Sequence, residues 1–282
     1  MKLGIGEYYI RRYGLEDGAR KMASHGYEYI DYNLMDIESD LYVLRDEDFV
    51  RMLYDIKKKL NAQGISVMQI HGPWRLPDNR TDEERAEHFE KATKALVMAK
   101  YLGAKYMAIH PLLPFGISPE GSLEVYAINK QFFSALANVA GNLGVTVCLE
   151  NLPFTECQIS RVESVVALIK DVDHPNLKMC FDVGHANVFE GRIGEKIRLA
   201  GDLIKIIHVH DNMGDADSHL LPYEGCVDWA DLAEGLFDVG FDGVFNLECA
   251  PVSKKRQNED VSDTEASALE ENLARTARLI AG

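Results

Sequence analysis

The chain has 282 residues, of which 46% are hydrophobic and 27% are charged, so it has enough apolar material for a large folded core. Its 45 acidic residues against 30 Lys and Arg give a formal net charge of -15, and a surface of that sign repels nucleic acids and anionic membranes. This composition excludes an intrinsically disordered chain and argues against DNA, RNA or a lipid surface as the main partner.

The location of the protein is predicted from two further features. We find neither a signal peptide at the amino terminus nor the roughly 20 consecutive apolar residues that would span a membrane. The five cysteines form no Cys-x-x-Cys pair, which is typical of thiols in a reducing compartment. We therefore expect a cytoplasmic protein, and whether it forms a homo-oligomer is left open.

Short apolar runs alternate with segments of helical period along the whole chain, and we count eight such units. The expected strands are residues 3–6, 29–33, 66–71, 106–110, 145–150, 178–182, 204–210 and 244–248. Eight strands that each precede a helix predict an α/β fold, a (β/α)8 TIM barrel, as a single domain over residues 1–282. An open doubly wound sheet is the alternative.

Capping and turn residues mark where the helices begin and end. Thr81-Asp82-Glu83-Glu84 predicts a capping box, and Ser118 followed by Pro119 predicts a second helix start. Glycines fall where helices are expected to end, at positions 26, 64, 103, 144 and 240. We expect a loop over the polar segment 251–264, on the face of the barrel where barrel enzymes carry their active sites.

Residues that can bind a metal ion stand at the ends of six consecutive expected strands. They are His71, His110, Glu150, Asp182, His208 or His210, and Glu248. The carboxyl ends of barrel strands meet in one mouth, so these side chains are expected to converge there. Any one of them is equally explained by a backbone hydrogen bond or a buried ion pair, but several carboxylates in one mouth need a cation to offset their repulsion. The pattern predicts one or more divalent metal ions.

Two short motifs in the following loops add candidate ligands. Asp182-Val183-Gly184-His185 and Asp217-Ser218-His219 each place a carboxylate and an imidazole two or three residues apart. Such a spacing serves one metal ion or two neighbouring ions.

Six stretches of the sequence together resemble the xylose-isomerase-like barrel superfamily, and they follow its order along nearly the whole chain. They are Gln69-Ile70-His71-Gly72-Pro73-Trp74, Ile109-His110-Pro111, Leu149-Glu150-Asn151, Phe181-Asp182-Val183-Gly184-His185, His208-Val209-His210-Asp211-Asn212 and Leu247-Glu248. This superfamily contains sugar isomerases and epimerases, inosose-processing enzymes and metal-dependent apurinic-site endonucleases.

The resemblance implies a metal site. In the sugar-processing members one divalent ion, often manganese, is held by residues that correspond here to Glu150, Asp182, His208 and Glu248. His208 is preferred to His210 because the first histidine of the His-x-His-Asp stretch resembles the family ligand. The implied cofactor is manganese or zinc, with magnesium or cobalt as alternatives. The endonuclease branch holds three zinc ions, and its further ligands would fall on His71, His110, His185, Asp217 and His219.

The resemblance also implies a carbohydrate substrate, which would be a sugar, a sugar phosphate or a cyclitol. Glu150 and Glu248 would be the acid and base of a proton transfer next to a carbonyl, through an enediolate. Isomerisation, epimerisation and dehydration of an inosose all proceed from such an intermediate, and the choice among them stays open.

Several residues are expected to contact that substrate. Trp74 would form a wall of the pocket, His185 would orient a substrate hydroxyl, and Glu156 resembles the carboxylate that ketose 3-epimerases place against their substrate. For Glu156, an ordinary solvated loop position is equally consistent with the sequence. Gly214 departs from the epimerase pattern, which has a substrate-binding arginine at this position.

Two rival classes remain. A three-zinc phosphodiesterase acting on abasic DNA would use all of these ligand residues, although the net charge of -15 opposes it. A barrel that keeps a structural or regulatory metal site while binding a metabolite would not be an enzyme.

Overall fold

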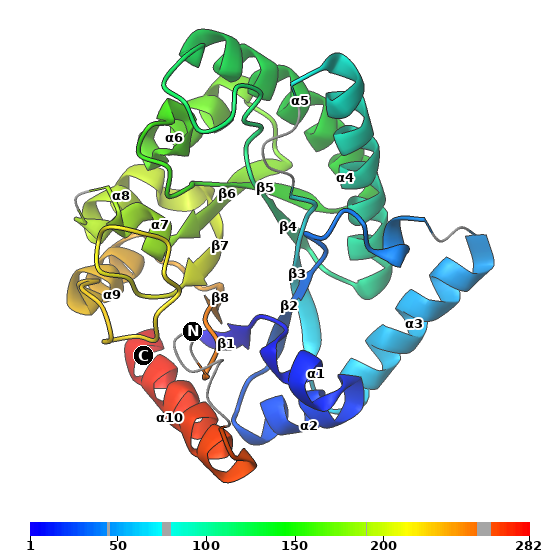
Figure 1. The fold of residues 1–282 in the computed structure, drawn as a ribbon, viewed down its shortest axis with the longest axis vertical. Helices are drawn as coiled ribbons and strands as arrows, with labels where there is room; N and C mark the ends of the chain where they lie inside the picture. The colour runs from blue at the N-terminus through cyan, green and yellow to red at the C-terminus, as the bar shows by residue number, and fades with distance from the viewer. Residues whose placement is uncertain (44–45, 75–79, 190, 253–260) are drawn as a thin grey trace.

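Figure 1 shows the computed structural model of the chain, in which a ring of strands is surrounded by helices. The structure describes residues 1–43, 46–74, 80–189, 191–252 and 261–282. The strands pair in sequence order and β8 pairs back to β1, with every neighbouring pair parallel, so that the sheet closes. The predicted (β/α)8 barrel is confirmed, and the open doubly wound sheet is excluded.

The strands match the predicted ranges to within one residue at each end. They are β1 (Lys2–Ile5), β2 (Tyr29–Asn33), β3 (Ser66–His71), β4 (Tyr106–Ile109), β5 (Thr146–Glu150), β6 (Leu177–Asp182), β7 (Ile204–Val209) and β8 (Val244–Leu247). The agreement is close because a barrel strand is buried on both sides and therefore reads as a compact apolar run.

The described helices cover the outside of this ring. The α-helices are α1 (Tyr8–Tyr13), α2 (Leu15–Ser24), α3 (Asp46–Ala62), α4 (Asp82–Leu102), α5 (Ser122–Leu143), α6 (Val162–Val172), α7 (Val183–Asn187), α8 (Ile193–Ala200), α9 (Trp229–Asp238) and α10 (Asp263–Ala281). Short 3-10 helices are η1 (Asp40–Tyr42), η2 (Gln158–Ser160) and η3 (Gly201–Leu203). None of the helices in the described ranges is long and apolar enough to cross a membrane.

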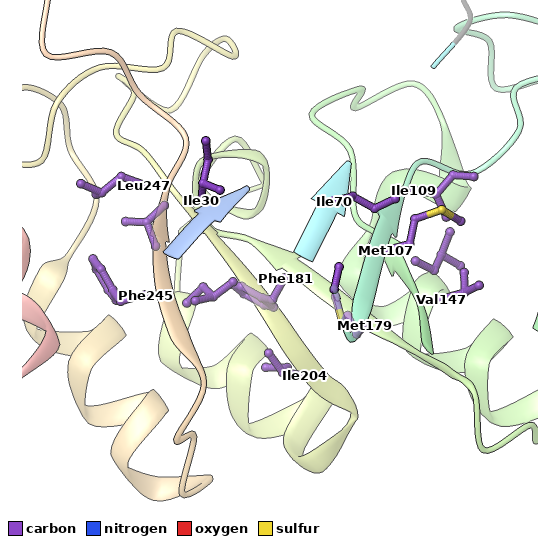
Figure 2. Packing of buried hydrophobic residues seen from close by; sticks show 14 of the residues in the cluster. Ile30, Ile70, Met107, Ile109, Val147, Met179, Phe181, Ile204, Phe245 and Leu247 are labelled. Carbon is purple, nitrogen blue, oxygen red and sulfur yellow. The ribbon is translucent and has the colours of Figure 1, made fainter. Parts of the chain in front are cut away.

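Successive strand residues face opposite sides of the barrel wall. Met107 of β4 and Val147 of β5 belong to the large core between strands and helices, and Figure 2 shows them next to each other. Ala108, Cys148 and Cys180 form a separate buried cluster, from the alternate positions that face inward. The inward series of β5 and β6 continues to Glu150 and Asp182, so the strand pattern itself aims these residues into the barrel mouth.

The helix ends agree with the sequence at most positions. The predicted capping box forms, since Oγ1 of Thr81 accepts a hydrogen bond from the backbone N–H of Glu84 and Glu84 accepts one from the N–H of Thr81. Gly103 and Gly144 end α4 and α5 in the left-handed conformation. The other three predicted glycines, Gly26, Gly64 and Gly240, lie just past α2, α3 and α9 and also have positive φ.

The predicted helix start at Ser118 and Pro119 is wrong, because α5 begins only at Ser122. Oγ of Ser118 accepts a hydrogen bond from the backbone N–H of Glu120 at 3.1 Å, so the hydroxyl closes a turn instead of capping a helix. Gly121 then takes a φ of 65°, and a side chain at this position would overlap the ring of Phe115. The helix therefore starts after the glycine.

The predicted loop over residues 251–264 is tested only at its two ends. Residues 253–260 lie outside the described residues. At the carboxyl end the prediction is too long, because α10 already includes Asp263 and Thr264. Ser262 forms a second capping box with Glu265, which fixes that boundary.

Candidate metal centre

The candidate ligands gather at the carboxyl end of the barrel. Those predicted on β3, β4, β5, β6 and β8 are the last residue of their strand or directly follow it, and His208 is the second-last residue of β7. Asp182 and His208 are register partners across β6 and β7. Glu150, Asp182 and His208 are fully buried. Ionisable groups buried this deeply need partners, so their contacts with one another define the site.

The primary group consists of Glu150, Asp182, His208 and Glu248. One ligand atom from each of these residues lies within 4.8 Å of the other three. Nδ1 of His208 is 3.0 Å from Oε1 of Glu150 and 3.3 Å from Oε2 of Glu248. The structure thus brings together the four residues that the resemblance singles out.

Unpartnered oxygens show what this group is suited to bind. Oε2 of Glu150, Oδ2 of Asp182 and Oε2 of Glu248 are buried and make no hydrogen bond among the described residues, although imidazole nitrogens lie 3.2–3.4 Å from the two glutamate oxygens. Buried carboxylate oxygens in this state are costly unless a cation satisfies them. Three carboxylates and one imidazole are a donor set that suits zinc or manganese. The primary group therefore fits a divalent ion.

His71 and His110 extend the primary group on the β3 and β4 side. Nε2 of His71 lies 3.2 Å from Oε2 of Glu150, and Nε2 of His110 lies 3.4 Å from the same oxygen. His71, Glu150 and His208 also form a set of ligand atoms within 4.8 Å of one another. Glu150 is therefore shared between the primary group and the histidines on the β3 and β4 side.

The secondary group consists of His185, His210, Asp217 and His219, whose ligand atoms also lie within 4.8 Å of one another. Nε2 of His185 is 3.5 Å from Asp217, and Nε2 of His219 is 3.1 Å from it. His210 connects the two groups, because its Nε2 is 3.2 Å from Oδ1 of Asp182 and 3.6 Å from Oδ1 of Asp217.

His210 is the member of the secondary group that the sequence offers only as an alternative to His208, which the resemblance prefers. A signal for it existed, since His208 and His210 are two residues apart and a strand turns both to its inner face. The structure places His208 in the primary group and His210 in the secondary group.

In the secondary group, His185 and His219 are held as cations beside the carboxylate of Asp217. Burial opposes the charged form of His185, but the carboxylates of Asp182 and Asp217 raise its pKa to about 10. Burial also opposes the charged form of His219, whose pKa Asp217 and Glu248 raise to about 9. The same two imidazoles hold the pKa of Asp217 far below its usual range despite its burial. The imidazolium ions of His185 and His219 therefore balance the charge of Asp217 when no metal is bound.

The metal-free protein should become less stable as the pH rises above neutrality. Because the pKa values of His219 and His185 are raised on folding, their contribution to the free energy of unfolding is complete below the unfolded value of about 6.5. It is lost as the pH rises through about 9 and about 10. A bound divalent ion replaces these protons, so metal should stabilise the protein more at higher pH.

Thermal unfolding in chelator and in Mn²⁺, from about pH 6.5 to about pH 9.5, measures both trends. Asp217→Asn should reduce the decline seen in chelator, because it removes the carboxylate that both histidines share. Metal-free protein that keeps or gains stability over this range would contradict the pairing.

Gly184 creates the space for His210. α7 starts directly after Asp182, whose Oδ1 accepts a hydrogen bond from the backbone N–H of His185 at 2.6 Å. A Cβ atom on Gly184 would overlap the buried imidazole of His210. Gly184→Ala should therefore lower the free energy of unfolding by about 1–3 kcal/mol, as overpacking of a core does.

Gly6→Ala is the matched control for this change, since its Cβ would meet nothing nearer than the backbone oxygen of Leu247 at 4.0 Å. Denaturant titrations of the two variants give the comparison. Equal stability of the two variants would show that the ring of His210 is free to move aside.

Asp211 holds the segment that carries Asp217 and His219. Its Oδ1 accepts hydrogen bonds from the backbone N–H groups of Asn212 and Val227, and its Oδ2 accepts one from that of Tyr223. Asp211 and Leu220 also exchange two backbone hydrogen bonds. One buried carboxylate therefore fixes both ends of the loop and aims its two ligand candidates at the barrel mouth.

Trp74 lies beside the metal ligands. Its ring meets that of His110 edge-on, with the centroids 4.1 Å apart. It also packs against a small apolar cluster that includes Leu113 and Leu152, from the loops after β4 and β5. This position suits a pocket wall, although the contact with substrate stays a prediction.

The two remaining substrate positions lie further out. Glu156 is exposed and accepts a hydrogen bond from Oγ1 of Thr155 at 3.4 Å, so its expected part in substrate binding also stays a prediction. Gly214 has a φ of 78° and donates its N–H to Oδ1 of Asn212. The position at which epimerases carry an arginine is here a tight turn that L-amino acids rarely adopt.

The family model described as "Xylose isomerase-like TIM barrel" matches residues 19–272. The chain belongs to this family. A relative named D-psicose 3-epimerase, from Ruminiclostridium cellulolyticum, is 34% identical over 114 residues, which cover 40% of this chain and 37% of that protein. A relative named probable endonuclease 4, from Metamycoplasma arthritidis, is 27% identical over 160 residues, which cover 53% of this chain and 56% of that protein. The matched part is thus less than two thirds of either relative.

Solved structures of family-like barrels show the same fold over the full chain. A D-psicose 3-epimerase in the presence of D-fructose has a TM-score of 0.79 at 21% identity, and 100% of both chains is covered. An IolI protein with a bound zinc atom has a TM-score of 0.74 at 19% identity, covering 99% of this chain and 96% of that one. At these identities the likeness concerns the fold.

Proposed function

We propose that the chain is a divalent-metal-dependent isomerase or epimerase that acts on a sugar, a sugar phosphate or a cyclitol. The observation that carries the proposal is the convergence of Glu150, Asp182, His208 and Glu248, with unpartnered carboxylate oxygens, at the mouth of the barrel. The family and the epimerase relative support the substrate class. Manganese or zinc is the proposed ion, and the zinc atom bound in the IolI structure, a barrel of the same fold, supports a divalent metal.

The proposed reaction is a proton transfer at a carbon next to a carbonyl. Glu150, Asp182, His208 and Glu248 would hold a divalent ion, which would supply a Lewis acid to polarise the carbonyl and stabilise the negative charge that develops on its oxygen. Glu150 on β5 and Glu248 after β8 reach the mouth from different parts of the ring. One carboxylate takes the C–H proton, and the other, as a carboxylic acid, returns a proton on the opposite face. The net result is inversion of the configuration at that carbon, with no proton consumed overall.

The same pair of groups allows two other outcomes. If the proton is returned to the neighbouring carbon, an aldose becomes a ketose. If a hydroxyl group leaves the carbon next to the one that lost its proton, an inosose loses water. His185 is the proposed partner of a substrate hydroxyl, because this member of the secondary group also reaches the primary group, 3.5 Å from Asp182 and 3.5 Å from Asp217. Trp74 and Glu156 are the proposed wall and rim contacts.

A substrate screen tests this proposal. Metal-loaded protein is incubated with ketoses, aldoses, inososes and their phosphates, and the products are separated by chromatography. We expect an epimer, an isomer or a dehydrated product from at least one class, and none from protein that has been stripped of metal. Absence of any product from all classes would refute the proposed activity.

A three-metal phosphodiesterase is the second candidate, since two observations favour it. The secondary group and the His71–His110 side together offer sites for two further ions, and one relative is named probable endonuclease 4. The net charge of -15 opposes binding of DNA. Elemental analysis and incubation with an abasic duplex separate the candidates: three zinc ions per chain with strand cleavage would favour the nuclease over the sugar enzyme.

A further inference from the structure

A buried carboxylate lies directly below the primary group, on a strand whose end supplies no predicted ligand. Asp31 is in the middle of β2 and is 5% exposed. Its Oδ2 accepts a hydrogen bond from Nε2 of Gln69 at 2.8 Å and one from Nδ2 of Asn246 at 3.3 Å. The third neighbour of this oxygen is Nε2 of His208, 3.0 Å away. Three side-chain donors from different strands therefore converge on one oxygen.

The setting of Asp31 ties it to the metal site. In the part of the chain that the structure describes, His208 is its one ion-pair partner, and Oδ1 of Asp31 has no hydrogen-bond partner. A buried carboxylate without Lys or Arg beside it is costly, so stability alone is a weak reason for an acid at this position. Its charge would instead add to that of the primary-group carboxylates and favour a cation there.

The two ring nitrogens of His208 point to opposite partners. Nε2 faces Oδ2 of Asp31 and lies 3.1 Å from Nε2 of Gln69, which donates to the same oxygen, whereas Nδ1 faces Glu150 and Glu248. When Nε2 donates its proton to Asp31, Nδ1 is left with a lone pair directed at the primary group. The imidazole is then fixed in the one tautomer that can bind a metal ion through Nδ1.

We propose that Asp31 is a positioning residue that orients His208 and strengthens metal binding at the primary group. The inference rests on the proposed function, because it assumes that this group holds a divalent ion. Gly4 of β1 is part of the arrangement, since a Cβ atom there would lie 2.7 Å from Oδ1 of Asn246. The space left by this glycine lets Asn246 extend across the barrel interior to Asp31.

Metal affinity of Asp31 variants tests the inference without any substrate. Asp31→Asn keeps the size of the side chain and removes its charge, and Asp31→Ala also removes the hydrogen-bond acceptor. Competition with a fluorescent chelator measures the Kd for Mn²⁺ and Zn²⁺. We expect about 10-fold weaker binding for Asp31→Asn and about 100-fold weaker binding for Asp31→Ala, the range seen when partners of metal ligands are removed. Co²⁺-loaded protein should also show an altered visible spectrum.

Glu270→Gln is the matched control. Glu270 is another fully buried carboxylate, but it lies on α10 and pairs with Lys21 and the hydroxyl of Tyr13, outside the barrel. This variant should lower the Tm and leave the Kd for Mn²⁺ unchanged. If Asp31 were merely structural, its variants would behave in the same way as Glu270→Gln.

The outcomes separate this inference from the proposed function. Folded Asp31→Asn protein with the affinity and Co²⁺ spectrum of the unaltered protein would overturn the inference alone. If Asp31→Ala does not fold, the Asp31→Asn result decides. Unaltered protein that binds neither Mn²⁺ nor Zn²⁺ would overturn both.

Discussion

Glu150→Gln should lower the rate of the proposed reaction by about 10³-fold and weaken metal binding. The substitution removes a base of the proton transfer, which is worth about 10² to 10⁴ in rate. It also removes one of three carboxylates from the primary group and leaves His71, His110 and His208 without the charge that they all face. Initial rates at saturating Mn²⁺ separate the loss of the base from the loss of the metal.

Glu163→Gln is the control for this variant, because Glu163 is an exposed acid on α6. It should keep the rate and the Kd for metal of the unaltered protein. Full activity of Glu150→Gln at saturating Mn²⁺ would contradict the role of Glu150 as acid or base. An unchanged Kd for metal would remove it from the ligand set.

Removal of the metal should abolish the activity and lower the Tm. A ligand at 100 times its Kd stabilises the folded state by about 2.7 kcal/mol. For a domain of this size that corresponds to a rise in Tm of roughly 5 °C or more. The expected result is an inactive protein after chelation, with activity and Tm both restored by Mn²⁺ or Zn²⁺.

His208→Ala provides the comparison for this experiment. His208 contributes the imidazole of the primary group, so its loss should reduce the shift in Tm that Mn²⁺ produces. A chelated protein that keeps both its Tm and its activity would show that the chemistry does not depend on metal. A shift in Tm that survives His208→Ala would place the ion in the secondary group.

The fold could be predicted from the sequence because its strands carry a strong local pattern. Residues 66–71 form β3 as predicted, and 145–150 differ from β5 by a single residue. The helix start at Ser118 could not be predicted in this way. A serine followed by proline closes a turn as readily as it opens a helix, and the conformation of Gly121 decided between the two.

The primary group could be predicted because residues at strand ends converge in every closed barrel. The role of Asp31 could not, because its partners lie on β3, β7 and β8, far away in the sequence. An acid between apolar and aromatic residues of a strand nevertheless indicates that its carboxylate is buried and needs a partner. The glycine at position 4, which leaves space for Asn246 beside Asp31, is likewise recognised only in three dimensions.

Solvent deuterium incorporation tests the central claim, metal-assisted proton transfer next to a carbonyl, most directly. The Mn²⁺-loaded protein is incubated in D₂O with the carbohydrate that the screen identifies, and NMR follows the hydrogen at the carbon beside the carbonyl. The account predicts deuterium at that carbon in both substrate and product, with exchange that stops on chelation and is reduced by about 10³-fold in Glu150→Gln. Turnover without deuterium incorporation, or exchange that persists without metal, would contradict it.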